Sequence, residues 1–447
     1  MQITMSYGKT STARPRPGYT RCVRRPRSLS AGIRSRVLLL PVMLLGIVAT
    51  SPGVASADSA SVRSCSRLGA FSARVQPPCW TPFSGKSPFN VRLPAKPRLA
   101  SNDAAVARHM SSYGWAFDGG SSKFQITAGG SRAVYFASPS DPVMRVNCTN
   151  AEGPGTCQGA NRVKVNGAKI HVPAGARPES NWDAHMTVVE TETGHEYDFW
   201  RASVSGSTLT AGTGSVENVN TANGLGAAGD AAGFSLTAGL LRPSELLAGH
   251  INHPLVIDVP CTNGHGANTG YVWPAHGGWG ESCGQYWNET KTGAPNLGQL
   301  FKLNMTDAEI ASSGAPEWEQ TIMTTLAHYG AYAEDTNGSH RDDRIYILKQ
   351  SSASWTSLGQ PDRWTRAIAQ LGGNNRILSS SVPIAASKLR VVDPCVPKGT
   401  CSGRRAPRPA ANRHPRRPPR TRDARRHRQH HRHSQHRRSR AAPRRRG

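Results

Sequence analysis

Polar and hydrophobic residues alternate most regularly on either side of Gly194, over residues 183–190 and 195–200. Two such runs joined by a short polar turn predict a β-hairpin. If Glu190 pairs with His195, alternating side chains fall on opposite faces of the hairpin. The apolar face then holds Met186, Val188, Tyr197 and Phe199, and we expect it to lie on the core. The other face holds Asp183, His185, Thr187, Glu196, Asp198 and Trp200.

The polar face of this hairpin has two interpretations. It is either the solvated outer face of a half-buried sheet or the wall of a polar cleft. Enzymes that cleave glycosidic bonds commonly use two carboxyl groups across a cleft, and a histidine can carry protons. Asp183, His185 and Asp198 are therefore the candidate catalytic residues, and Trp200 is a candidate for stacking on a sugar ring.

Short alternating runs broken by Gly, Ser, Asn and Pro continue from about residue 123 to 260. Strands at this spacing are typical of a sandwich or a barrel. Apolar residues at helical spacing, with capping signals, predict helices at 101–113, 242–249, 316–330 and 362–371. Thr306 and Glu309 have the spacing of a capping box. We expect one mainly β domain over 58–401, a jelly-roll-like β-sandwich with three or four peripheral helices; an α+β fold is the alternative.

Residues 1–57 have the order of a secretory signal peptide. Nine Lys and Arg and no acidic residue precede an apolar run at 37–49, and Ala55 and Ala57 give the small-x-small pattern of a cleavage site. The run is short for a transmembrane helix. An uncleaved signal anchor is the alternative, and translation could start at an internal codon. We expect a secreted protein, extracellular or associated with the cell surface.

The net charge of +27 comes from the two ends of the chain. The leader carries nine basic residues, and the tail 402–447 carries eighteen arginines and one acidic residue, which leaves 28 basic and 27 acidic residues in 58–401. A domain so close to neutral gives no reason to expect a specific nucleic-acid partner. The tail has hardly any apolar residue and is predicted to be disordered. It is either an electrostatic tether to an anionic wall polymer or membrane surface, or a reading-frame artefact.

Eight cysteines remain once the leader, with Cys22, is removed. An even number of cysteines in an exported chain indicates disulfides. The simplest pairing joins neighbours in sequence, although eight cysteines allow many connectivities. That pairing is Cys65–Cys79, Cys148–Cys157, Cys261–Cys283 and Cys395–Cys401. No spacing matches a zinc motif, so we expect neither a metal nor a cofactor.

Two further regions could bind a ligand. His253 follows His250 at a spacing of half a metal site, but it shares its strand face with apolar residues, which favours a buried histidine near the edge of a cleft. The Gly-rich loop 262–288 carries Trp273 and Trp279, and Cys261–Cys283 would close its base. Aromatic rings on such a loop either stack on saccharides or cover the core. We take His253, Trp273 and Trp279, with Trp200, as candidate substrate-binding residues.

Several short motifs follow one another in a fixed order between about 85 and 375. They include Ser87-Pro88-Phe89-Asn90, Asp183-x-His185, Tyr197-x-x-Trp200, Gly249-x-Ile251-x-His253-x-Leu255, Val272-Trp273-Pro274-Ala275 and Tyr329-Gly330-x-Tyr332-x-x-Asp335. In this order they resemble a widespread, uncharacterised family of exported bacterial proteins. Members of that family typically carry Ala where Pro254 stands. The resemblance implies export, a single domain and a β-rich fold, and it brings no established reaction.

Two functions therefore remain open at the level of the sequence. The first is a secreted, carbohydrate-active enzyme, a hydrolase or lyase acting on a cell-wall or environmental polysaccharide. The second is a non-catalytic glycan- or wall-binding protein. In both cases the expected partner is a polysaccharide, and we expect the protein to be a monomer.

Overall fold

The computed structural model describes residues 80–111, 121–126, 131–151, 157, 164–226, 229–266, 268–286, 293–337, 344–372, 381–385 and 388–401. The leader, the Cys65–Cys79 pair and the tail 402–447 lie outside these residues. The described residues, 80–401 with the gaps given above, belong to one compact unit. The described part of the chain combines helices with three sheets and is a mixed α+β, β-rich fold.

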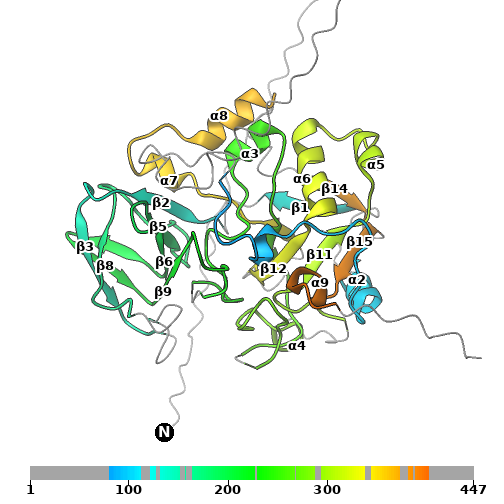
Figure 1. The fold of residues 1–447 in the computed structure, drawn as a ribbon, viewed down its shortest axis with the longest axis horizontal. Coiled ribbons are helices and arrows are strands. Elements are labelled where there is room, and N and C mark those ends of the chain that lie inside the picture. Colours follow the sequence, from blue (N-terminus) through cyan, green and yellow to red (C-terminus); the bar gives the residue numbers. More distant parts are fainter. Residues whose placement is uncertain are drawn as a thin grey trace, which may run out of the picture. The chain divides into compact units, whose positions relative to one another are not determined.

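The largest sheet has seven strands. Their order is β14 (Ser381–Ala385), β1 (Ser121–Ile126), β13 (Ile345–Ile347), β10 (Leu255–Val259), β12 (Ala331–Thr336), β11 (Leu300–Leu303) and β15 (Leu389–Val392). Strands β12, β11 and β15 lie side by side in it (Figure 1). The sheet is mixed, because β1 pairs with β13 and β10 with β12 in parallel. All five residues of β10 are buried, as expected for a strand with helices and loops on both faces.

Helices surround this sheet. Helix α6 (Glu317–His328) packs on β11, α2 (Asp103–Ser111) on β15, and α3 (Pro243–Ala248) against α8 (Arg363–Gln370). The four predicted helices are thereby confirmed, and so is the capping box of Thr306 and Glu309 at α5 (Asp307–Ala311). The remaining short helices are the 3-10 turn η2 (Pro88–Asn90), α4 (Cys283–Tyr286), α7 (Ala353–Thr356) and α9 (Cys395–Lys398).

Two four-stranded sheets enclose a second core. One has the order β2 (Ala133–Ala137), β5 (Met186–Glu190), β6 (His195–Trp200) and β9 (Thr213–Asn218). The other has the order β4 (Lys169–His171), β3 (Val143–Cys148), β8 (Thr208–Ala211) and β7 (Ser203–Ser205). Val146 and Leu209 from the second sheet pack with Val188 and Phe199 from the first. Strand β2 serves both cores, since Tyr135 points into this one and Val134 into the core of the large sheet.

The predicted hairpin and its register are confirmed. Met186 pairs with Phe199 and Val188 with Tyr197, so the apolar face does lie on a core. The opposite face is not solvated, however. Thr187, Glu196 and Asp198 are each at most 1% exposed, because the segment 229–237 covers them.

The predicted jelly-roll sandwich is not confirmed. A jelly roll is built from two antiparallel sheets, whereas the described strands form three sheets, and each of these contains a parallel pair as well as antiparallel ones. The chain also has more than the three or four helices we expected, since α4, α5, α7 and α9 join the four predicted ones. The α+β alternative describes the structure better.

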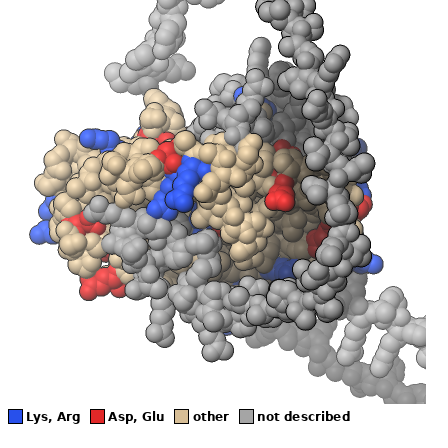
Figure 2. Space-filling model, turned by 90° about the horizontal axis from the view of Figure 1, so that it is seen from above, with Lys and Arg blue, Asp and Glu red and all other residues tan. Residues whose placement is uncertain are grey.

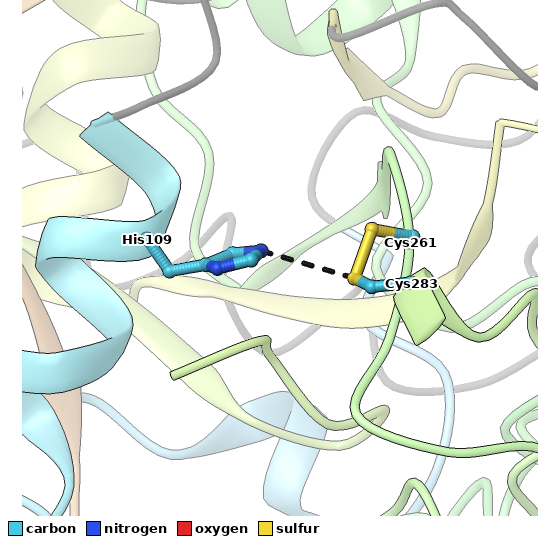
Figure 3. Close-up of side chains that lie close together, drawn as sticks. All are labelled: His109, Cys261 and Cys283. Atoms are coloured by element: carbon cyan, nitrogen blue, oxygen red, sulfur yellow. Dashed lines mark hydrogen bonds between the residues drawn. A yellow bond between two sulfur atoms is a disulfide. The ribbon is translucent and has the colours of Figure 1, made fainter. Parts of the chain in front are cut away.

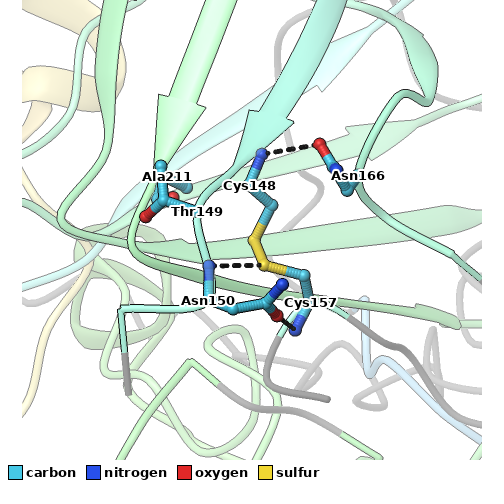
Figure 4. Close-up of a disulfide and its surroundings, with 6 residues drawn as sticks. All are labelled: Cys148, Thr149, Asn150, Cys157, Asn166 and Ala211. Carbon is cyan, nitrogen blue, oxygen red and sulfur yellow. Dashed lines mark hydrogen bonds between the residues drawn. A yellow bond between two sulfur atoms is a disulfide. The ribbon is translucent and has the colours of Figure 1, made fainter. Parts of the chain in front are cut away.

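Three of the expected disulfides are present: Cys148–Cys157, Cys261–Cys283 and Cys395–Cys401. The first ties the end of β3 to a following loop, where the backbone N–H of Cys157 donates to the Asn150 side chain and that of Cys148 to Asn166 (Figure 4). Such bonds are consistent with an oxidising compartment. Within the described ranges, none of the helices has the length and apolar character needed to cross a membrane.

Candidate functional site

A buried arginine, Arg132, sits just before β2 and contacts the large sheet. Its guanidinium donates to Glu334 Oε1 of β12 at 2.7 Å and to Nδ1 of His185, before β5, at 3.0 Å. Because Nδ1 accepts from Arg132, Nε2 carries the imidazole proton and donates to the Gly229 carbonyl at 2.8 Å. Burial and the neighbouring Arg132 lower the pKa of His185 well below its usual value, so this histidine is neutral at pH 7.

Four aspartates share the surroundings of Arg132, and we call them, with Glu334, the acidic cluster. Asp258 lies in β10, Asp335 in β12, Asp183 before β5 and Asp230 after β9. Burial, and then the charge of Asp335, raises the pKa of Asp258; burial, and then Glu334, raises that of Asp230. One guanidinium cannot neutralise five carboxylates, so some of them keep a proton near neutral pH.

Part of the acidic cluster is accessible to solvent. Asp258 and Glu334 are buried, whereas Asp183, Asp230 and Asp335 are half-buried. Oδ1 of Asp258 has no hydrogen-bond partner among the described residues. The pKa of Asp335 is raised to about 7. Burial is the main cause, the charges of Asp183 and Glu334 add to it, and a hydrogen bond from the Thr336 N–H and the charge of Arg132 oppose it. Asp335 is thus a carboxyl group that is protonated, and can donate, near neutral pH.

Aromatic residues stand at the edge of the acidic cluster, at the open end of the hairpin. The indole N–H of Trp200 donates to Asp183 Oδ1 at 3.0 Å. Trp182 is 79% exposed, and the guanidinium of Arg201 lies 3.9 Å from the centre of the Trp200 ring and 5.0 Å from that of Trp182. Ala184 and Arg201 both have positive φ, at 45° and 50°, conformations that residues other than glycine seldom adopt. Such strain is concentrated at functional sites.

A second group of carboxylates lies deeper, on the polar face of the hairpin. Glu196 accepts from the backbone N–H and hydroxyl of Thr237, and Asp198 accepts from Thr187 Oγ1 and the Leu236 N–H. Burial raises the pKa of Asp198 to about 6 and, with the charge of Asp198, that of Glu217 to about 8. These side chains hold residues 224–226 and 236–237 on the sheet, and they are buried.

The structure thus separates the three predicted catalytic residues. Asp183 belongs to the acidic cluster. His185 lies beside it, but it is only 2% exposed and its ring contacts Arg132 and Gly229. Asp198 belongs to the deeper group. Trp200 lies at the site through its hydrogen bond to Asp183.

The other predicted binding residues are also separated. His253 is 4% exposed and bridges Glu245 of α3 at 2.9 Å and the Pro254 carbonyl at 2.8 Å, so it fastens α3 to the start of β10. Trp273 is half-buried, with the Lys398 ammonium 5.5 Å from its ring centre. Trp279 is 54% exposed, and its backbone N–H bonds the Ala231 carbonyl, next to Asp230 of the acidic cluster.

Sequence reasoning did not single out Arg132, Asp230, Asp258 or Asp335 as site residues. A signal was available for two of them: Asp258 interrupts the apolar strand β10, and Asp335 is the second of two adjacent acidic residues that follow the apolar start of β12. A carboxylate in a buried strand is costly unless it is paired or protonated. Arg132 stands in no motif, and only the fold brings it to Glu334.

One group of potential metal ligands lies apart from the acidic cluster. His109 of α2 points toward the Cys261–Cys283 disulfide, with Nε2 3.8 Å from Cys283 Sγ (Figure 3). Metal ions bind the thiolate form of cysteine, and both sulfurs are committed to the disulfide. It is the only group of this kind that the described residues contain, and it does not form a metal site in this oxidised state.

Comparisons with protein-family models, with curated proteins and with solved structures find no match to this chain.

Proposed function

We propose that this chain is an exported glycoside hydrolase that acts on a cell-wall or environmental polysaccharide, with its site at Asp183 and Asp335, two half-buried members of the acidic cluster. The observation that carries the proposal is Asp335. It is half-buried, its pKa is raised to about 7, and it interacts electrostatically with the carboxylate of Asp183. Glycoside hydrolysis requires one protonated carboxyl group as the acid and a second, ionised one as base or nucleophile.

Each group has a role in this proposal. Asp335 donates its proton to the glycosidic oxygen as the bond to the anomeric carbon breaks. Asp183, oriented by the Trp200 indole, either activates the water that attacks that carbon or attacks it directly. Arg132 and the neutral His185 are positioning residues that keep the acidic cluster folded. Trp182 and Trp279 offer exposed rings, and an aromatic face packs well against the apolar face of a sugar.

The alternative is a glycan-binding protein without turnover. The exposed tryptophans support this alternative as well as they support the enzyme, since stacking on a sugar requires no acid or base. Burial of several carboxyl groups raises their pKa values, and this favours the enzyme, because raised pKa values are concentrated where a proton is to be transferred. A lyase is less well supported, because an excess of carboxylates repels the acidic sugars that lyases cleave. Both the enzyme and the glycan-binding alternative include export by the leader 1–57 and a tail that acts as an electrostatic tether.

The test uses the exported protein and a panel of purified wall polysaccharides. Release of reducing ends measures hydrolysis, ultraviolet absorbance of an unsaturated product measures elimination, and pull-down measures binding. Asp335→Asn should abolish hydrolysis and keep binding and the melting temperature. Asp307→Asn, an exposed substitution of the same kind, is the control.

The pH profile adds a second criterion. Hydrolysis should decline as the pH rises through about 7, because Asp335 loses the proton that it must donate. Binding without any product would support the glycan-binding alternative. Full activity in Asp335→Asn would contradict the assignment of this site.

A further inference from the structure

A pocket of about 560 Å³ opens between α3, α7, α8 and strand β2. It contains no residue of the acidic cluster. Its size falls within the range of small-molecule sites. Figure 2 views the molecule from the side on which α3 and α8 lie in Figure 1, and there Lys and Arg side chains stand beside a largely uncharged surface.

One wall of this pocket is apolar. Pro243 and Leu247 of α3 face Trp355 and Leu358 of the α7 region. Leu247 is 41% exposed, one of only a few large hydrophobic side chains among the described residues with so much exposure. An exposed apolar side chain at a concave surface indicates a ligand that would cover it.

The rim of the pocket also carries two arginines, Arg363 and Arg366, one turn apart on α8. The Arg363 guanidinium lies 5.7 Å from the centre of the Trp355 ring. Neither arginine forms an ion pair with another described residue. Asp362 also lines the pocket, but its oxygens accept from the Trp364 N–H at 3.0 Å and the Thr365 hydroxyl at 3.1 Å as the cap of α8.

The electrostatic repulsion between the two arginines of the rim also favours a bound anion. Burial, followed by the charge of Arg366, lowers the pKa of Arg363. Two guanidiniums that raise each other's free energy are stabilised by an anion between them. Arginine side chains bind a carboxylate with paired hydrogen bonds, and better so when water is partly excluded.

We propose that this pocket binds an amphipathic carboxylate, a single acyl chain of medium length whose head group lies between Arg363 and Arg366 and whose chain lies against Leu247, Trp355 and Leu358. The head satisfies the charge of the rim, and the chain removes apolar surface from water. The site does not depend on the glycosidase function proposed above.

The experiment titrates the full-length exported protein with hexanoate, octanoate and octanol by calorimetry, at concentrations below micelle formation. Octanoate should bind about 15-fold more tightly than hexanoate if both added methylenes are buried. Octanol, which lacks the charge, and inorganic phosphate, which lacks the chain, should bind at least tenfold more weakly than octanoate. Added salt should weaken octanoate binding.

Variants locate the site. Arg366→Gln and Arg363→Gln should each weaken octanoate at least tenfold, and Leu247→Asp should abolish binding, while Arg145→Gln on the exposed side of β3 should change nothing. If affinity does not rise with chain length, or if phosphate binds as tightly, the pocket is a simple anion site and the proposal fails. Equal binding in Arg366→Gln, Arg363→Gln and Arg145→Gln would place the ligand elsewhere. Polysaccharide hydrolysis, measured in the same variants, should remain unchanged.

Discussion

The Arg132–Glu334 ion pair supports the candidate site, and its removal should be costly. The two side chains are 4% and 2% exposed, and their atoms lie 2.7 Å apart. Removing one partner of a buried pair leaves the other charge without compensation, at a cost of about 3–5 kcal/mol. Arg132→Met should therefore lower the free energy of unfolding by about this amount, a large share of the ~5–15 kcal/mol typical of a domain.

The chain supplies a matched control. Arg98 and Asp393 form a pair of similar length, 2.9 Å, but their side chains are 51% and 20% exposed. A pair open to water contributes at most about 1 kcal/mol, so Arg98→Met should have little effect. Denaturation by urea at pH 7, with the midpoint and slope fitted for each variant, measures the difference.

A double variant and a change of pH test this reasoning. Adding Glu334→Gln to Arg132→Met should recover much of the loss, because no charge is then left buried opposite the missing arginine. The defect of Arg132→Met should also be smaller at pH 5 than at pH 8, because the remaining carboxylates can then take protons. If Arg132→Met costs no more than Arg98→Met, the acidic cluster is hydrated and the argument from burial is wrong.

Three further outcomes are expected. Because the pKa of Glu217 is raised to about 8, the folded state keeps a proton that the unfolded chain loses above about pH 4.5. The free energy of unfolding should therefore fall by at most about 1.4 kcal/mol per pH unit as the pH rises from about 4.5 to 8. Melting temperatures recorded across this range should depend less on pH in Glu217→Gln than in the wild type. Non-reducing peptide mapping should recover Cys148–Cys157, and replacing both by Ser should cost roughly 2–3 kcal/mol for so short a loop, whereas free thiols would contradict the pairing. His185→Ala should destabilise the protein by about 1–3 kcal/mol, because Arg132 loses an acceptor in a buried site, and a wild-type melting temperature would show that water replaces the ring.

The features that the sequence predicted are those set by nearby residues. The hairpin register follows from alternation over a few positions, and helix α6, Glu317–His328, lies within the predicted range 316–330. The disulfides join cysteines 6 to 22 residues apart. In each case the interacting groups are close in sequence, so local chemistry alone determines the outcome.

The acidic cluster could not be predicted in this way. Arg132 and Glu334 are 202 residues apart in sequence. The alternation assigned Asp198 to a polar face correctly, but it could not show that a later segment, ending at Thr237, covers that face. A raised pKa depends on such burial, and burial depends on parts of the chain that a local pattern does not include.

The alternation of β2 has a consequence for cooperativity. Val134 and Phe136 belong to the core of the large sheet, while Ala133, Tyr135 and Ala137 belong to the core of the two smaller sheets. A slip of one residue would exchange the two sets, and melting of β2 would expose both cores together. Residues 57–401 should therefore unfold in one calorimetric transition, and neither half should form a stable fragment when it is expressed alone.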